Sequence, residues 1–282
     1  MPKHAYLILA HNDVPLLQTL VRCLDDSRND IFIHWDAKSG ALPSLETEHS
    51  RLKFLDRRIN VGWAGYSMVE AEYLLFKEAF AHGPYAYYHL ISGVDLPIKS
   101  QDYIHAECAR LNGTEFIAFA PATQAEIDYR VQHRFLFPEE FRTKNVWKRG
   151  LRRLYLRFQD LIHKKRTDLV VRKGSQWCSL TQDFVAYLIE QEAFVKELFS
   201  HTFCPDELFV QTVCFHSPFA EKVKAARTEF EGNMRFIKWK DGTLLPLDDD
   251  DYPALLGSDR WFARKFSGSD SELITKIAHI SR

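Results

Sequence analysis

The stretch AYLILAHNDVPLLQTLVRCLDDSRNDIFIHWD, residues Ala5 to Asp36, decides the fold. It opens with a short continuous apolar run, Ala5 to Ala10, and closes with another, Ile31 to Asp36, and each run is typical of a buried strand. Between the two runs, one helical face carries Leu16, Leu17, Leu20, Val21 and Leu24. Strand, helix, strand is the opening of a parallel sheet, so we predict an α/β fold.

The alternation continues along the next residues. KFLD (53–56) predicts a short strand, VEAEYLLFKEAF (69–80) a helix and AYYHLIS (86–92) a further strand. Ligands bind to a sheet of this kind at the carboxyl ends of its strands, where this chain reads HND, HWDAKS and SGVD. These polar ends predict a nucleotide-sized site, although polar residues also end strands wherever a chain must turn.

The second half of the chain is predicted from similar patterns. GSQWCSL (174–180) and RFIKW (235–239) each read as a strand, and TQDFVAYLIEQEAFVKELF (181–199) reads as one helix. A short helix is expected at YPALL (252–256). We find no internal repeat and no low-complexity linker, so we expect a single domain over residues 1–282.

Composition excludes some classes of protein. With 282 residues and 46% hydrophobic residues the chain can bury a core, and its formal net charge of -1 gives no basic field for nucleic acid. The cysteines, an odd number without a CxxC pair, are expected to be reduced thiols: Cys23, Cys108, Cys178, Cys204 and Cys214. The first apolar run is too short for a signal-peptide core and no run approaches about 18 apolar residues, so we expect a cytoplasmic protein.

Two charged stretches allow more than one interpretation. The segment from Arg142 to Lys173 is strongly basic with interleaved apolar residues, which fits a long solvated helix or a surface for an anionic acceptor or a membrane edge. The run DDDD, residues 248–251, is expected to be a solvated loop, because adjacent carboxylates in a loop bring no fixed metal geometry. In HWD, His34 and Asp36 supply too few ligands for a metal, and a strand-end turn is preferred.

Two short segments could carry chemistry. In FCPDELF (203–209), Asp206 and Glu207 fit an ordinary helix start, yet either carboxylate could also take a proton. In FARKF (262–266), Arg264 and Lys265 fit an amphipathic segment or a clamp for a diphosphate. The local sequence leaves both questions open. Phosphate loops, GxGxxG and GxSxG are absent from the sequence, which argues against P-loop, dinucleotide and serine-hydrolase chemistry.

Several segments together resemble one family, the core-2/I-branching enzymes and peptide xylosyltransferases of glycosyltransferase family 14. The matching strings, in order, are YLILAHND, IFIHWDAKS, VGWAGYSMVEAEYLLF, YYHLISGVDLPIKS, KGSQWCSLTQDFVAYLI, TFCPDELFVQTV, RFIKWKDG and FARKF. They span nearly the whole chain. SGVDLPIKS and the spacing from GSQW to PDE are the specific features.

The resemblance implies a GT-A-like fold, with a Rossmann-like, mostly parallel sheet flanked by helices. It implies inverting transfer of a sugar from a UDP-sugar to a hydroxyl of a glycan, without a metal or other cofactor. GlcNAc is expected first, with xylose or glucose as alternatives, and a non-catalytic nucleotide-sugar or glycan-binding module is the other interpretation. Glu207 is then the general base, one carboxylate being enough for a single displacement, and Asp206 orients or caps the helix.

The resemblance also implies roles for other residues. Lys265 matches the family's lysine on the diphosphate, but the usual upstream partner falls in DGTLLPLDDDD, which has no arginine, so Arg264, Arg260 and Arg235 are candidates. The nucleotide and donor side is expected to include His11, Asp36, Lys38 and Asp95. The acceptor side is expected to include Trp239, Ser175, Gln176, Trp177, Arg130 and Arg134. Residues 1–110 would then form the nucleotide-sugar half, and residues 111–282 the acceptor and catalytic half.

We expect neither the amino-terminal anchor nor the paired cysteines of the Golgi members. The chain therefore resembles a bacterial, cytoplasmic relative whose acceptor is a surface polysaccharide or a lipid-linked glycan, with the basic segment 142–173 suited to the inner face of a membrane. A glycoside hydrolase is disfavoured, because it needs two carboxylates on opposite sides of a bond and the adjacent Asp206 and Glu207 project in different directions.

Overall fold

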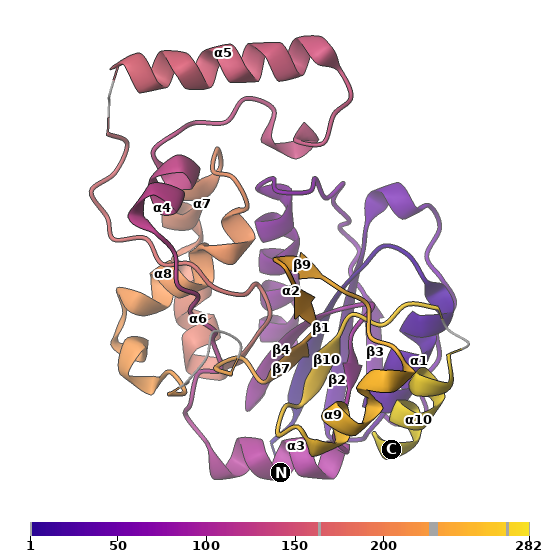
Figure 1. Ribbon diagram of the computed structural model, residues 1–282. Helices are drawn as coiled ribbons and strands as arrows, with labels where there is room; N and C mark the ends of the chain where they lie inside the picture. The colour runs from indigo at the N-terminus through magenta and orange to yellow at the C-terminus, as the bar shows by residue number, and fades with distance from the viewer. Residues whose placement is uncertain (1, 163–164, 226–230, 269–270, 282) are drawn as a thin grey trace.

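Figure 1 shows a computed structural model of the chain, which describes residues 2–162, 165–225, 231–268 and 271–281. Its central sheet has the strand order β3-β2-β1-β4-β6. The strands are β1 (His4–Ala10), β2 (Asn29–Trp35), β3 (Arg51–Phe54), β4 (Tyr87–Ser92) and β6 (Cys178–Thr181). All neighbours pair in parallel except β4 and β6, which are antiparallel. The predicted α/β class with a mostly parallel sheet is confirmed.

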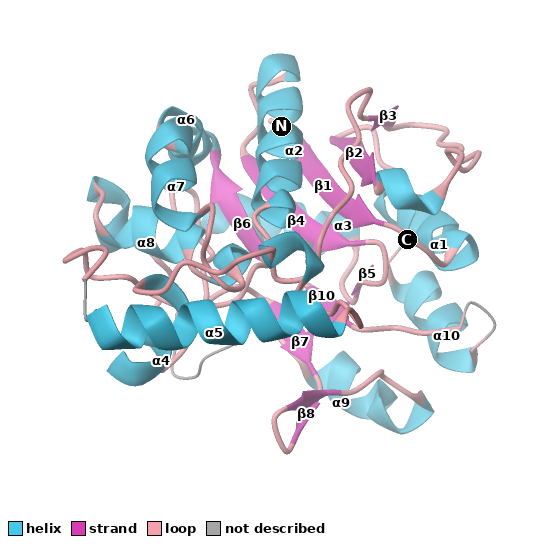
Figure 2. Ribbon diagram, turned by 90° about the horizontal axis from the view of Figure 1, so that it is seen from above, coloured by secondary structure: helices cyan, strands magenta, loops and turns pink. Residues whose placement is uncertain are grey.

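Helices cover both faces of this sheet (Figures 1 and 2). Alternate residues of β1 enter separate cores: Leu7 packs with α2 (Ser67–His82), and Ile8 packs with α1 (Val14–Leu24) and α10 (Glu272–Ile280). Because both faces of β1 are buried, its sequence is a continuous apolar run. The predicted helix over Val14–Leu24 and the predicted helix in 69–80 are both confirmed. Helix α3 (Gln101–Arg110) follows β5 (Leu96–Pro97).

A second, smaller sheet has the order β5-β10-β7, with β10 at Phe262–Arg264 and β7 at Arg235–Ile237. The prediction of one strand over 235–239 is wrong, because Trp239–Lys240 (β8) leaves this sheet to pair with β9 (Thr243–Leu244). Between the two strands, Nζ of Lys238 lies 2.8 Å from carboxylate oxygens of both Asp248 and Asp251.

Asp248, Asp249 and Asp250 are exposed, so the acidic run is solvated as predicted, but it forms a 3-10 turn rather than an irregular loop. Asp248 caps a 3-10 turn over Asp249–Asp251, and its side chain accepts from the backbone N–H of Asp250. Asp248 and Asp251 also bind Lys238. The short helix expected after this run is confirmed as α9 (Tyr252–Gly257).

Two further predicted elements are divided in the structure. The helix expected over 181–199 is two helices, α6 (Gln182–Glu190) and α7 (Glu192–Phe199), which meet at Gln191. The strand expected at 174–180 is confined to β6 (Cys178–Thr181), because the preceding residues bond to other segments. Asp206 does not cap the next helix, α8 (Phe209–Phe215), whose N-cap is Leu208 without a side-chain cap bond.

The basic segment contains α5 (Val146–Ile162), in which every residue is at least partly exposed, as a solvated helix requires. Residues 163–164 of that segment lie outside the described residues, and 165–173 are not helical. The preceding chain contains α4 (Gln124–Val131) and a 3-10 turn at Pro138–Glu140. Among the described residues, no helix is both long enough and apolar enough to cross a membrane. The cysteines are buried thiols, as predicted.

Candidate active site

A cleft of about 450 Å³ opens at the carboxyl ends of β1, β2 and β4. These ends contribute Leu9, Ala10, His11, His34, Asp36, Ser92 and Val94 to its lining. The site expected from the polar strand ends therefore lies where parallel strands of an α/β sheet place ligands.

The other walls come from segments far apart in the sequence. They are the VGWAG loop (61–65), residues 173–177, the 3-10 turn Pro205–Glu207, β10 and the β8–β9 hairpin. The predicted site residues that line the cleft are His11, Asp36, Ser175, Gln176, Trp177, Glu207, Trp239 and Arg264. The fold thus places the polar ends of β1, β2 and β4 next to residues of FCPDELF and of FARKF.

Backbone hydrogen bonds tie these walls to one another. The N–H of Cys204 donates to the carbonyl of Ala64 at 3.1 Å, and the N–H of Gly174 donates to the carbonyl of Glu207 at 2.9 Å. Ala64 and Cys204 both have left-handed backbones, with φ of 68° and 48°. Such conformations cost free energy in residues other than glycine and gather at functional sites, so this loop contact marks the site independently of the side chains.

Gly174 fits this arrangement because it has no side chain. A Cβ atom at this position would lie 1.8 Å from the carbonyl oxygen of Ala118. The close approach lets the 173–177 segment run between residues 118–120 and the turn that carries Glu207, where it forms one wall of the cleft.

Glu207 is 38% exposed at the cleft and is held by an arginine. Nη1 of Arg130 lies 2.7 Å from Oε2 of Glu207, while Nη2 lies 3.0 Å from Oε1 of Glu126. Lys173 also binds Glu126, at 2.8 Å. Oε1 of Glu207 makes no hydrogen bond within the described part of the chain, so this oxygen can accept a proton from a group in the cleft.

Two more acidic side chains, Asp206 in the cleft lining and the buried Glu72, lie near Glu207. Glu72 of α2 is fully buried, and its Oε1 accepts a hydrogen bond of 2.6 Å from Nε2 of Gln176. Burial, together with the nearby charge of Asp206, raises the pKa of Glu72 well above its usual range. Burial, together with the adjacent charge of Glu207, raises the pKa of Asp206 to about 7. Asp206 and Glu207 thus line the cleft side by side, and Glu72 lies buried near Asp206.

Arg264 is the cation of FARKF that lines the cleft. Its guanidinium carbon lies 4.3 Å from the ring centre of Trp177, and its Nε lies 3.3 Å from Oδ1 of Asp95. Asp95 itself is fully buried and accepts hydrogen bonds from the backbone N–H and the hydroxyl of Ser92. The expectation that Asp95 contacts the donor is therefore corrected: Asp95 fixes Arg264 instead.

The other candidates for an anion clamp differ in position. Lys265 follows Arg264 directly, is partly exposed, and pairs with no carboxylate in the described residues. Arg260 pairs with Asp259 at 3.1 Å and lies outside the cleft lining.

Arg235 was expected as a third candidate, and the structure contradicts this. Its guanidinium is buried and donates to Ser179 Oγ at 2.8 Å and to the carbonyls of Leu90 and Cys178. Burial lowers its pKa to about 10. Arg235 therefore joins β4, β6 and β7 within the core and does not reach the cleft.

Lys38 and Arg134 also lie away from the cleft lining. Nζ of Lys38 donates to the carbonyl of Val61 and lies 3.7 Å from Asp36. Lys38 thus contacts two residues of the lining without lining the cleft itself. Arg134 is exposed, and its backbone is paired with Gln159 of α5. Of the two arginines predicted on the acceptor side, only Arg130 reaches the site.

Comparison with known proteins identifies the family. The family model described as "Branch: Core-2/I-Branching enzyme" matches residues 4–254. The chain belongs to the Core-2/I-branching enzyme family. It is thus a member of glycosyltransferase family 14, and sugar transfer is the chemistry of its curated relatives.

The similar proteins are distant. Xylosyltransferase 2 of Rattus norvegicus is 22% identical over 83% of this chain and 26% of its own length, so the chain spans about a quarter of that relative. The beta-1,3-galactosyl-O-glycosyl-glycoprotein beta-1,6-N-acetylglucosaminyltransferase 4 of Mus musculus is 22% identical over 96% of this chain and 64% of its own length. The apo form of mouse xyloside xylosyltransferase 1 is 10% identical, with a TM-score of 0.33 over 77% of this chain and 83% of that one. That structural likeness is too weak to carry an argument.

Sequence reasoning missed several residues in or beside the cleft of this Core-2/I-branching family member. Trp63 lines the cleft, is 45% exposed, and lies beneath the guanidinium of Arg142 at 3.8 Å. The sequence did contain a signal for Glu72, because this acidic residue lies on the same helical face as the apolar Val69 and Tyr73. Lys173 sat at the end of the basic segment, where nothing distinguished it from its charged neighbours.

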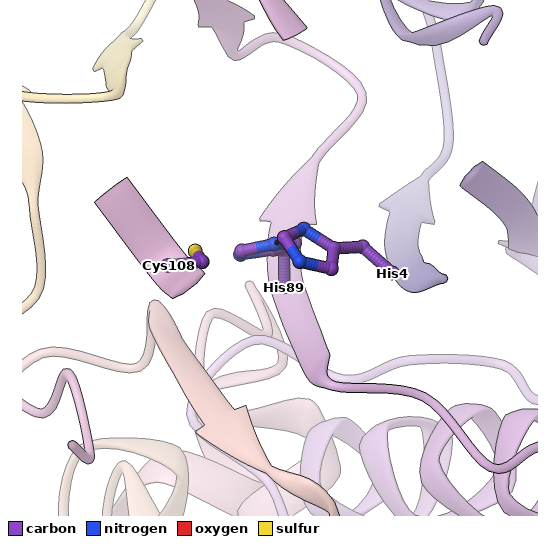
Figure 3. Close-up of side chains that lie close together, drawn as sticks. All are labelled: His4, His89 and Cys108. Carbon is purple, nitrogen blue, oxygen red and sulfur yellow. Dashed lines mark hydrogen bonds between the residues drawn. The ribbon is translucent and has the colours of Figure 1, made fainter. Parts of the chain in front are cut away.

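One group of metal-type ligands occurs among the described residues, formed by His4, His89 and Cys108 (Figure 3). Nε2 of His89 is 3.1 Å from Nδ1 of His4, and its Nδ1 is 2.8 Å from Ser179 Oγ, so these nitrogens already bond to each other and to a hydroxyl. Burial raises the pKa of Cys108 well above its usual range, which disfavours the thiolate that metals bind. We interpret the group as packed core.

Proposed function

We propose that this protein is an inverting glycosyltransferase that moves GlcNAc from a UDP-sugar to a hydroxyl of a glycan acceptor. The observation that carries the proposal is the position of Glu207, whose carboxylate faces the cleft at the ends of β1, β2 and β4 and is oriented by Arg130. Family membership supports sugar transfer, and the names of the relatives include both xylosyl- and N-acetylglucosaminyltransferases.

Glu207 would act as the general base in a single displacement. The acceptor oxygen forms a bond to the anomeric carbon of the donor while the bond from that carbon to the UDP oxygen breaks. The acceptor proton passes to Oε1 of Glu207, and UDP leaves with the electron pair of the broken bond. Arg130 holds Oε2 and so fixes the direction of Oε1.

The leaving diphosphate would be neutralised by side chains. Arg264 lines the cleft and is fixed on two sides by Trp177 and Asp95, so it needs little reorganisation when charge develops on the diphosphate. Lys265 is the next residue; it is partly exposed and outside the cleft lining, and we propose that its side chain supplies the second cation of this clamp. Two such cations give the charge stabilisation that a metal ion supplies elsewhere, which supports a reaction without a metal.

The acceptor would lie against aromatic side chains. Trp63 and Trp239 both line the cleft, and 45% and 46% of their surfaces are exposed. Large exposed indole rings suit the apolar C–H face of a sugar. The two rings come from the VGWAG loop and the β8–β9 hairpin, which line the same cleft as Glu207.

The donor can be identified by thermal stabilisation and by UDP release. Purified protein is heated with UDP-GlcNAc, UDP-xylose, UDP-glucose, a GDP-sugar and a CMP-sugar, each with EDTA and with added manganese. Ligand binding to the folded state raises Tm in proportion to occupancy. We expect UDP-GlcNAc to raise Tm equally with EDTA and with manganese, and UDP to be released.

Other results would change the proposal. Stabilisation by UDP-xylose alone would replace the donor, and stabilisation only with manganese would overturn the metal-free clamp. Binding without release in the presence of glycan acceptors would favour a non-catalytic binding module, and no binding of any UDP-sugar would contradict the proposal.

A further inference from the structure

Helix α5 is amphipathic, and it binds the rest of the protein through its polar side. Lys148 lies 2.6 Å from the Glu140 carboxylate, Gln159 donates to the carbonyl of Arg134 at 3.0 Å, and Asp160 lies 2.8 Å from Nε2 of His133. Arg152 lies over the ring of Phe141 at 4.1 Å. A surface helix of a globular protein usually does the opposite and turns its apolar side toward the core.

The outer face of α5 consists of Trp147, Leu151, Leu154, Phe158, Leu161 and Ile162. The spacing of three and four residues places these side chains on one side of the helix. Trp147 is 85% exposed and Leu161 is 79% exposed. Figures 1 and 2 show α5 lying across one end of the molecule, outside the helices that cover the sheet. A contiguous apolar face of this kind indicates a surface that something else covers.

The charges beside the outer face indicate what covers it. Arg149, Arg153 and Arg157 are exposed and recur every four residues, so they form a basic row along one edge of that face. The acidic residue of α5, Asp160, is paired with His133. If α5 of a second copy of the chain packed on this face, its own basic row would meet the first one, because α5 has no acidic row to pair with it. An anionic lipid surface offers both the negative charge and the apolar layer.

We propose that α5 lies in the interface of an anionic lipid bilayer, with its outer face in the acyl region and the arginine row at the headgroups. Contacts lead from α5 to the cleft: Arg152 lies over Phe141, and the Phe141 ring is 6.0 Å from that of Trp63, which lines the cleft. The bilayer would therefore lie on the Trp63 side of the cleft. A lipid-linked glycan is then the acceptor class, and this last step rests on the proposed function.

Vesicle sedimentation tests the proposal. The whole protein is mixed with vesicles of phosphatidylcholine alone and with vesicles containing phosphatidylglycerol, at low and high salt. We expect binding to the anionic vesicles that weakens with salt, and Leu154→Glu/Phe158→Glu to reduce that binding about tenfold or more. Arg149→Gln/Arg153→Gln should remove most of the salt dependence.

The matched control is Leu42→Glu/Leu256→Glu, which adds the same charge at two exposed leucines outside α5 and the cleft. It should bind vesicles as the unmodified protein does. The UDP-induced rise in Tm should be the same in every variant, which shows that the fold is retained and separates this test from that of the transferase activity.

Failure of the unmodified protein to bind anionic vesicles would overturn the proposal, as would equal loss of binding in the control. Gel filtration tests the alternative that a second copy of the chain covers the outer face. A dimer that Leu154→Glu/Phe158→Glu dissociates, without vesicle binding, would assign the outer face to a second copy of the chain and contradict a lipid surface.

Discussion

Three carboxyl groups, on Glu72, Asp206 and Glu207, lie close together but in different surroundings. Glu72 is fully buried and bonded to Gln176, Asp206 is partly buried, and Glu207 is exposed to the cleft and paired with Arg130. Burial raises the pKa of both Glu72 and Asp206, which disfavours their charged forms. Glu207 is the most exposed of the three and is the group placed to exchange protons with a ligand.

The pKa of Asp206 gives a prediction for stability against pH. In the folded protein that pKa is about 7, above the value of about 3.9 for an aspartate in an unfolded chain. The folded state thus binds more protons between these values, and stability falls as pH rises from about 4 to 7. We expect Asp206→Asn to raise Tm relative to the unmodified protein at pH 8 by a few degrees, roughly 2–4 °C per kcal/mol, and by less at pH 4.5. Thermal unfolding at both pH values would measure this, and a pH-independent difference would contradict it.

The two arginines of DYRVQHRF, Arg130 and Arg134, allow a test substitution and a matched control. Arg130→Met removes the ion pair with Glu207, so the carboxylate loses its orientation. We expect kcat for sugar transfer to fall about 10- to 100-fold with little change in donor affinity, because small displacements of a reacting group cost factors of this size. Arg134→Met changes an exposed side chain outside the cleft and should leave kcat close to that of the unmodified protein. Equal effects of the two substitutions would show that Arg130 has no special role.

At the scale of elements, the sequence predicted those that local pattern controls. β1, β2 and β4 each contain a short apolar run and are buried on both faces, and α1 and α2 have regular apolar spacing. The predictions failed where distant contacts decide the backbone. The N–H of Gly174 bonds to Glu207 rather than to a strand, and Lys238 interrupts 235–239 because it pairs with Asp248 and Asp251. No local pattern contains such partners.

Substitutions at two glycines test whether distant contacts decide the backbone at Gly174. Gly174→Ala places a Cβ 1.8 Å from the carbonyl oxygen of Ala118, and we expect a loss of stability of about 2–3 kcal/mol because backbone must move. Gly150→Ala, within α5, meets no atom within 4 Å in the described structure and should stabilise the protein by about 0.5–1 kcal/mol through helix propensity. Urea unfolding of both variants measures the difference, and equal effects would contradict the contact at Gly174.

At the scale of the whole molecule, the cleft is a product of long-range packing. Pattern predicted the strand ends that carry His11 and Asp36, and family resemblance predicted Glu207, Trp239 and the GSQW segment. Neither predicted that Glu72 meets Gln176. Such contacts join residues about a hundred positions apart, and only the assembled sheet and helices bring them together. The division into a donor half over 1–110 and an acceptor half over 111–282 stays a prediction, although Arg264 of the second half lies beside Asp95 of the first.

The central claim is that Glu207 takes the proton of the acceptor, and Glu207→Gln tests it most directly. Sugar transfer and the UDP-induced rise in Tm are measured together, with Glu190→Gln, at an exposed position of α6, as control. Because a positioned general base contributes about 10²- to 10⁴-fold, we expect turnover to fall by at least that lower factor, with UDP binding retained and the control unaffected. Turnover of Glu207→Gln near the rate of the unmodified protein would contradict the assignment.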